Sequence, residues 1–313
     1  MITRADVDEA RARIEGRVRR TPLIAVDPGA FGGQTWMKLE FLQHTGSFKA
    51  RGAFNRILEA QANGDLDPAV GTVAASGGNA GLAHAYAGAQ LGVPVTVFVP
   101  TITSPVKLAK LQALGANVIQ AGHEYAGAYE AARIHAEGTG ALFCHAYDQA
   151  PIAAGAGTLG LEILEDLDGQ VDTVVIAVGG GGLLAGVAAA VEGTARVVGV
   201  EPTGAPTLAE ALRVGSPVDV PVSGVAADSL GARRIGDIAL DVALRTGARS
   251  LLVSDDDLIH ARRLLWDHRR IAVEHGAAAA LAALTSGGYV PEPGERVVVV
   301  LCGANTDPSD LVG

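Results

Sequence analysis

The stretch from Val171 to Gly193 reads VDTVVIAVGGGGLLAGVAAAVEG. It opens with an apolar run typical of a strand, passes through four consecutive glycines, and ends in a run typical of a helix. A strand without polar alternation indicates a sheet covered on both faces, as parallel sheets are in α/β proteins. The stretch therefore predicts a strand, a tight glycine turn and a helix within such a sheet.

The same alternation of strand and helix patterns continues on both sides of this stretch. Further apolar runs stand at residues 71–75, 93–100, 117–122, 141–147, 195–202 and 296–305, with helical patterns between most of them. We therefore predict an α/β fold with parallel sheets. Ligands of such sheets bind beyond the carboxyl ends of the strands, so the strand-to-loop junctions are where a site is expected.

Two helix starts can be predicted from capping boxes. Thr3 and Asp6 have the capping-box spacing, and so do Ser254 and Asp257. Apolar residues then recur at helical intervals after Thr3, and Pro22 is expected to end that first helix. No long polar linker divides the chain, so composition alone marks no domain boundary.

Composition and charge exclude several classes of protein. The 313 residues are 49% hydrophobic and carry a formal net charge of −10, without basic runs. An acidic chain of this kind is not expected to bind nucleic acid or an anionic membrane surface. The two cysteines, Cys144 and Cys302, lie far apart in the sequence, which suits a reducing compartment. No signal segment or membrane span is evident, and we expect a cytoplasmic protein.

The glycines Gly179 to Gly182 are a candidate phosphate cradle. They follow a strand and precede a helix, where backbone N–H groups and the helix dipole both favour an anion. The sequence is neither GxGxxG nor a P-loop, and a tight turn with close helix packing explains it equally well. A second junction of this type runs from Ser76 to Asn79, where an ordinary helix cap is the simpler interpretation.

Lys49 and Cys302 are ambiguous when each is taken alone. Lys49 lies in HTGSFKARGAFNR, beside Phe48, and a single lysine is usually a surface charge. Cys302 ends the last apolar run, where a free cysteine is usually a small buried hydrophobic residue.

Four motifs in this order, KLEFLQHTGSFKARGA, SGGNAG, GGGGL and LCGAN, resemble the β-family of pyridoxal-phosphate enzymes. This family includes serine and threonine dehydratases, serine racemase, cysteine synthase and tryptophan synthase β. The resemblance runs from Arg20 to about Asp310. It implies two open twisted, mostly parallel sheets with helices on both faces. It also implies a large domain from residues 1–45 and 146–313, a small domain from residues 46–145, and a homodimer.

The resemblance also implies roles for individual residues. Lys49 would be the catalytic residue and would form the Schiff base with pyridoxal phosphate. The cofactor would be bound by Phe48, Lys49, Asn79, Gly179, Gly180, Gly181, Gly182, Leu183 and Cys302. The substrate would be bound by Ser76, Gly77, Gly78, Asn79 and Ser229. A monovalent cation, K⁺ or Na⁺, would be bound by Glu201, Ala205, Thr207, Leu230 and Ala232.

The motifs look most like those of liver-type serine dehydratases. The implied reaction is dehydration and deamination of L-threonine or L-serine, giving 2-oxobutanoate or pyruvate and ammonia. Dehydratases of 3-hydroxyaspartate or phenylserine are alternatives, and so is a catalytically silent ligand-binding relative. A serine racemase is disfavoured because Gly77 stands where racemases carry a serine that acts as an acid and base. The roles of His44 and His275, where relatives often carry other residues, stay open.

Overall fold

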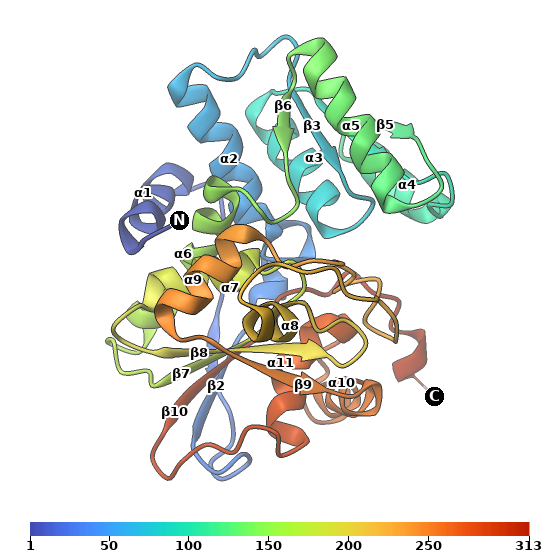
Figure 1. The fold of residues 1–313 in the computed structure, drawn as a ribbon. Coiled ribbons are helices and arrows are strands. Elements are labelled where there is room, and N and C mark those ends of the chain that lie inside the picture. Colours follow the sequence, from blue (N-terminus) through green and yellow to red (C-terminus); the bar gives the residue numbers. More distant parts are fainter. Residues whose placement is uncertain (313) are drawn as a thin grey trace.

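Two β-sheets organise the chain in the computed structural model, which describes residues 1–312 (Figure 1). The larger sheet has the strand order β1 (Leu23–Ala25), β2 (Gln34–Lys38), β10 (Arg296–Val300), β7 (Thr173–Ala177), β8 (Arg196–Pro202) and β9 (Arg249–Val253). The smaller sheet has the order β5 (Asn117–Gln120), β4 (Val95–Val99), β3 (Thr72–Ala75) and β6 (Leu142–Cys144).

Within these sheets the pairing is parallel at every junction except the one between β1 and β2. The prediction of an α/β fold with two mostly parallel sheets is therefore confirmed. The strands of the smaller sheet all lie between residues 72 and 144. The division of the chain into domains at residues 45/46 and 145/146 stays a prediction.

Eleven α-helices within the described residues cover these sheets. They are α1 (Arg4–Ile14), α2 (Lys49–Asn63), α3 (Asn79–Leu91), α4 (Pro105–Ala113), α5 (Tyr125–Thr139), α6 (Ala150–Asp166), α7 (Gly182–Val191), α8 (Thr207–Val214), α9 (Asp237–Thr246), α10 (Asp255–Arg269) and α11 (His275–Thr285). Short 3-10 helices are η1 (Glu40–Leu42), η2 (His44–Gly46) and η3 (Ser309–Leu311). None of the helices in residues 1–312 is both long and apolar enough to cross a bilayer.

Helix α2 connects the two sheets. The smaller sheet lies with α3, α4 and α5 in the upper part of Figure 1, and the larger sheet lies in the lower part. Helix α2 packs against α3 on one side and α6 on the other. Its first residue is Lys49, so this lysine lies where the two parts of the chain meet.

The capping boxes and most strands are where the sequence predicts them. The backbone N–H of Thr3 donates to Asp6 at 2.7 Å, and that of Ser254 donates to Asp257 at 2.9 Å. The predicted end of the first helix at Pro22 is wrong, because α1 ends at Ile14. Gly16, with φ of 71°, adopts a left-handed conformation there that ends the helix.

The core of the larger sheet is built from small and branched side chains. The valines Val297 to Val300 on β10 are fully buried. Helices α6 and α7 cross so closely that a Cβ on Gly186 would lie 2.1 Å from the carbonyl oxygen of Ala153. This explains the many alanines and glycines in both helices, since larger side chains would separate them.

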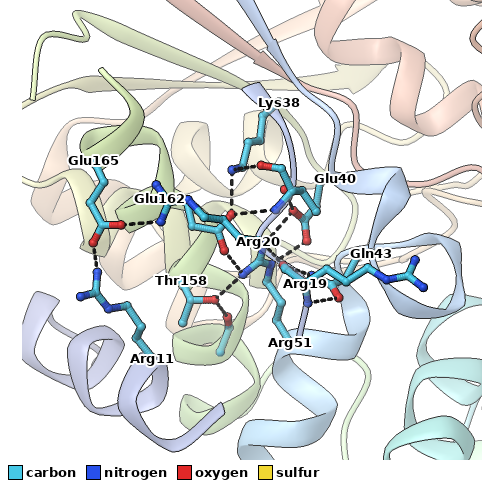
Figure 2. A network of polar contacts seen from close by, with 12 residues as sticks. Arg11, Arg19, Arg20, Lys38, Glu40, Gln43, Arg51, Thr158, Glu162 and Glu165 are labelled. Atoms are coloured by element: carbon cyan, nitrogen blue, oxygen red, sulfur yellow. Dashed lines mark hydrogen bonds and ion pairs between the residues drawn. The ribbon is translucent and has the colours of Figure 1, made fainter. Parts of the chain in front are cut away.

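A cluster of buried charges joins α2 to the larger sheet (Figure 2). Arg51 donates to Glu40 at 2.6 Å and to Glu162 at 2.7 Å, and Lys38 donates to Glu162 at 2.7 Å. These residues come from α2, η1, α6 and β2, and each is buried. We call Lys38, Glu40, Arg51 and Glu162 the buried ion cluster. Its two cations balance its two anions, which is the condition for keeping charges away from water.

The charges of the cluster depend on one another. Burial alone would lower the pKa of Arg51, but Glu40 and Glu162 raise it above its ordinary value, so the guanidinium stays charged. Removing one partner would leave an opposite charge buried without compensation.

Replacing Arg51 by methionine is expected to lower the free energy of unfolding by about 3–5 kcal/mol, since Glu40 and Glu162 would lose their shared cation. The measurement is urea unfolding followed by circular dichroism. The matched control is Arg133→Met, because Arg133 pairs with Glu130 and Glu137 on an exposed helix face and its loss should change little. Equal effects of the two changes would contradict this account of the cluster.

Candidate active site

Lys49 follows a turn with an uncommon backbone conformation. Thr45 has φ of 61°, a left-handed value that residues other than glycine seldom adopt, and Gly46 follows with φ of 74°. The turn is fixed to the end of β10, because Ala304 N–H donates to the Gly46 carbonyl at 2.9 Å and Phe48 N–H donates to the Cys302 carbonyl at 3.1 Å. Lys49 is therefore positioned by the backbone of both chain segments.

The amine of Lys49 points toward the end of β6. Its Nζ atom donates to the carbonyl of Ala146 at 2.6 Å and lies 4.9 Å from the centre of the Phe48 ring. Burial lowers the pKa of Lys49 to about 8, against the opposing effect of Cys302 and Glu274. Within residues 1–312 no carboxylate lies within 4 Å of this amine. At pH 7 about a tenth of this amine is therefore uncharged, far more than for an ordinary lysine, and an uncharged amine is a nucleophile and a base.

The glycines Gly179 to Gly182 form a close-packed turn at the carboxyl end of β7. A Cβ on Gly180 would lie 2.4 Å from the ring of Tyr147, and a Cβ on Gly181 would lie 2.4 Å from the Cβ of Ala239. Gly181 also has a left-handed φ of 86°. A Cβ on Gly182 would lie 2.8 Å from the backbone oxygen of Tyr147, so packing alone accounts for three of the four glycines.

This turn is also suited to bind a phosphate. Helix α7 begins at Gly182, and the first N–H groups of a helix have no acceptor within the helix. These N–H groups and the helix dipole favour an anion at this point. A buried amine of lowered pKa and a glycine anion cradle are the two features that pyridoxal phosphate requires, so the residues fit the expected cofactor. Leu183, the second residue of α7, is buried behind the cradle.

Asn79 is the first residue of α3 and follows the loop after β3. Its amide nitrogen donates to the carboxylate of Glu274 at 2.8 and 3.0 Å, and its amide oxygen accepts from Asn305 at 2.7 Å. Glu274 and Asn305 were not among the residues predicted to form the site. Asn305 is the last residue of the LCGAN motif, and its position after the last strand is the sequence feature that could have identified it as a site residue.

Ser76, Gly77 and Gly78 form the loop between β3 and α3. The Ser76 hydroxyl accepts from the N–H of Gly78 at 3.3 Å. A Cβ on Gly78 would meet nothing within 4 Å, so this loop faces open space that a substrate carboxylate could enter. A Cβ on Gly77 would lie 3.4 Å from Thr103, an ordinary contact, so the missing side chain there is not dictated by packing.

Cys302 lies at the carboxyl end of β10 and is buried. Burial raises the pKa of its thiol to about 12, so it remains a protonated thiol at neutral pH. Ser229 makes hydrogen bonds within the protein. Its hydroxyl accepts from the N–H of Gly276 at 3.0 Å and lies 3.3 Å from the carbonyl of Ala226, so it caps α11. Its role in substrate binding stays a prediction.

The residues predicted to bind a cation lie next to the glycine turn. The Thr207 hydroxyl donates to the Gly179 carbonyl at 2.6 Å, and Leu230 packs against Gly179. The carboxylate of Glu201 is buried and accepts from the N–H groups of Leu208 and Ala209 and from the hydroxyl of Ser250, and the Thr207 hydroxyl oxygen lies 2.9 Å from it. A cation at this point would have to displace some of these donors, and its binding by Glu201, Ala205, Thr207, Leu230 and Ala232 stays a prediction.

The two histidines with open roles have different surroundings. His44 stacks on Tyr86 of α3 with ring centres 4.8 Å apart, and its Nδ1 atom lies 3.1 Å from the Tyr86 hydroxyl oxygen. Burial lowers the pKa of His275, helped by the positive charge of Arg262, while Asp310 and Asp255 raise it. His275 therefore lies among charges of α10 and the C-terminal segment.

An aromatic cluster adjoins the site and was not predicted. Tyr147 lies between Ala146, the acceptor for Lys49, and the glycine turn against which its ring packs. The ring of His145 meets it edge-on at 4.6 Å, and the ring of Tyr129 meets His145 at 5.7 Å. These rings come from the loop after β6 and from α5, so no short sequence motif brings all of them together.

Comparison with known proteins gives consistent matches along the whole chain. The profile of the family described as "Pyridoxal-phosphate dependent enzyme" matches residues 14–303. An L-threonine ammonia-lyase of Thermotoga maritima is 34% identical over 98% of this chain and 76% of that enzyme. A phenylserine dehydratase of Ralstonia pickettii is 38% identical over 95% of this chain and 91% of that enzyme. The structure of maize serine racemase superimposes with a TM-score of 0.92 at 28% identity, covering 99% and 95% of the two chains.

The lowered pKa of Lys49 predicts how cofactor uptake depends on pH. Uptake of pyridoxal phosphate by the cofactor-free protein should accelerate about tenfold per pH unit below about pH 8 and then level off, because the uncharged amine is the reactive form. The measurement is the rate of the visible absorbance change. The reaction with N-acetyl-lysine at each pH corrects for titration of the cofactor itself. A rate that keeps rising to the ordinary lysine pKa of 10.5 would contradict the prediction.

Proposed function

The chain belongs to the family of pyridoxal-phosphate-dependent enzymes, and we propose that it is an ammonia-lyase that dehydrates and deaminates L-threonine or L-serine. The observation that carries the proposal is the partly buried Lys49 amine, which has a lowered pKa and no carboxylate partner within residues 1–312. Its acceptor, Ala146, adjoins Tyr147, which packs against the glycine turn. The products would be 2-oxobutanoate or pyruvate, and ammonia.

Each group at the site has a role that its environment supports. Pyridoxal phosphate, when bound, supplies the electron-withdrawing ring that stabilises negative charge on the substrate. The N–H groups of Gly179 to Gly182 and Leu183 would hold the phosphate, and those around Ser76 to Asn79 would hold the substrate carboxylate. The uncharged Lys49 amine then takes the proton from the α-carbon of the substrate.

Elimination is favoured over racemisation at this site. Racemisation requires a second acid on the opposite face of the substrate, and the glycine at residue 77 has no side chain to provide one. A side chain would fit there, since its Cβ would make only ordinary contacts. The structural likeness to maize serine racemase therefore supports the shared fold, and racemisation is the weaker alternative.

A phenylserine-type substrate is the second candidate. One similar enzyme is a phenylserine dehydratase, and an aromatic ring, Tyr147, lies beside the carbonyl that binds Lys49. His145 and Tyr129 continue this aromatic surface. An aryl group on the substrate β-carbon would gain edge-to-face contacts with such rings. No comparable feature favours 3-hydroxyaspartate.

Two further expectations belong to the proposal. A homodimer is supported by the partly exposed apolar side chains of the edge strand β1 and of Trp36, together with the 42% exposed Leu42. A cytoplasmic location is supported by the two cysteines, which are both free and buried. The proposal also includes a monovalent cation beside Glu201.

The proposed activity predicts 2-keto acid release by the protein loaded with pyridoxal phosphate in potassium buffer. L-threonine, L-serine, threo-phenylserine and threo-3-hydroxyaspartate are assayed in parallel. Lys49→Ala should reduce turnover by at least about a thousandfold, since it removes both the attachment point and the base. Release of D-serine from L-serine without keto acid would instead establish the racemase, and activity with 3-hydroxyaspartate alone would remove both proposed substrate classes.

The aromatic surface predicts a change in substrate preference. Tyr147→Leu should lower the ratio of kcat/KM for phenylserine to that for threonine by about 2–10-fold, the equivalent of one lost aromatic contact. Tyr125→Leu is the control, because Tyr125 belongs to the same aromatic cluster but is 47% exposed on α5. An unchanged ratio in Tyr147→Leu would show that this ring does not contact the substrate side chain.

A further inference from the structure

Glu274 occupies a helix-capping position but does not cap its helix. It immediately precedes α11, and its side chain makes no hydrogen bond to the first turn. The cap is supplied by Ser229, whose hydroxyl accepts from the N–H of Gly276 at 3.0 Å. The direction of the Glu274 side chain is therefore not required by the helix that it precedes.

The carboxylate of Glu274 points instead toward the start of α3 and toward the segment after β10. It accepts from the Asn79 amide nitrogen at 2.8 and 3.0 Å and from the backbone N–H of Asn305 at 2.9 Å. Glu274 is only 7% exposed, and burial raises the pKa of its carboxyl group. A Cβ on Gly303 would lie 3.1 Å from this carboxylate, so a glycine there leaves the space that it occupies.

These hydrogen bonds determine the orientation of the Asn79 side-chain amide. An ionised carboxylate only accepts hydrogen bonds, so the NH₂ end of Asn79 must face Glu274. The oxygen end then faces the Asn305 amide, which donates to it at 2.7 Å and also donates to the Thr45 carbonyl at 2.7 Å. Both hydrogens of the Asn305 amide are thereby used, and the arrangement cannot invert without losing several bonds at once.

One N–H of Asn79 remains available in this arrangement. The two N–H bonds of an amide diverge widely, whereas the two oxygens of one carboxylate lie close together. Both distances from the Asn79 nitrogen to Glu274 therefore describe a single N–H shared between two oxygens. Residues 1–312 provide no other acceptor for this nitrogen within hydrogen-bond distance. The second N–H is fixed in direction and free to donate to a ligand.

We propose that Glu274 is a positioning residue, which orients the Asn79 amide so that its free N–H would be available to donate to bound pyridoxal phosphate. The proposal rests on the cofactor in the proposed function and not on which amino acid is the substrate. In this proposal the length of the Glu274 side chain matters, because it brings the carboxylate into contact with Asn79. Its negative charge also faces Lys49, so the experiment must separate reach from charge.

Two substitutions separate these effects. Glu274→Asp keeps the charge but withdraws the carboxylate by one methylene group, which breaks the contact with Asn79. Glu274→Gln removes the charge but keeps the length of the side chain. Its oxygen can accept from both Asn79 and Asn305, as Oε1 of Glu274 does, while its NH₂ group replaces Oε2 and removes only the longer half of the shared bond with Asn79. The equilibrium dissociation constant of pyridoxal phosphate is measured by titrating the cofactor-free protein, so the readout needs no substrate.

We expect Glu274→Asp to weaken cofactor binding about tenfold and Glu274→Gln to weaken it less than about threefold. Glu295→Asp is the matched control. Glu295 is another buried glutamate, bonded to Thr173 and Tyr289 before the first residue of β10, and its change should leave the dissociation constant unaltered. The reverse order, with Gln weaker than Asp, would show that charge and not orientation is what Glu274 contributes, and would overturn the proposal.

A double substitution tests whether the effect passes through Asn79. In an Asn79→Ala background, Glu274→Asp should cause no further loss of cofactor affinity, because the residue that it positions is gone. A full additional tenfold loss would contradict the proposal. Melting temperatures of the cofactor-free variants identify any general loss of folding. If the wild-type protein bound no pyridoxal phosphate, the proposed function itself would be refuted. If all variants bound it equally, only the role of Glu274 would be refuted.

Discussion

The ion pairs between Arg51 and the two glutamates Glu40 and Glu162 are the interaction on which the site depends. Arg51 lies two residues after Lys49 on the first turn of α2, and its partners belong to η1 and α6. The three elements are thereby held together by charges that are away from water, where their attraction is strongest. These ion pairs also fix the position of Lys49, since α2 can neither rotate nor slide without separating them (Figure 2).

A second constraint is that the carboxylate that acts on Lys49 is bonded to other residues. Glu274 accepts from Asn79 and Asn305 and makes no ion pair with Lys49. The amine donates instead to a carbonyl, and burial lowers its pKa by more than Glu274 raises it. The electrostatics of the site follow from how neighbouring charges are paired, and the reactivity of Lys49 follows from those electrostatics.

The sequence predicted those features that are local. The tetraglycine turn, the capping boxes at Thr3 and Ser254, and most strands could be read from short stretches, because each depends on residues that are neighbours in the chain. The end of α1 was missed because Gly16, a local stop, was given less weight than the apolar spacing beyond it. Helix α6 was not predicted at all, although Glu162 on it completes the buried ion cluster.

The parts of the site that the sequence could not predict are contacts between distant segments. Asn79 and Glu274 are separated by 195 residues, and Lys49 and Ala146 by 97. Neither contact can be recognised in a single sequence. A glutamate before a helix is usually interpreted as a helix cap, and the acceptor for Lys49 is a backbone carbonyl, which every residue has. The substrate-binding role of Ser229 was predicted from resemblance. Its hydrogen bond to the N–H of Gly276, which caps α11, joins residues that are distant in the sequence and could not be predicted.

The central claim is that Lys49 is the residue that carries the cofactor, and the chain offers a direct test because it contains only four lysines. Lys38 belongs to the buried ion cluster, while Lys107 and Lys110 lie on α4. The protein loaded with pyridoxal phosphate is reduced with borohydride, digested, and mapped by mass spectrometry. The account predicts one modified peptide, containing Lys49, at about one cofactor per chain. Modification spread over Lys107 and Lys110, with the Lys49 peptide unchanged, would contradict it.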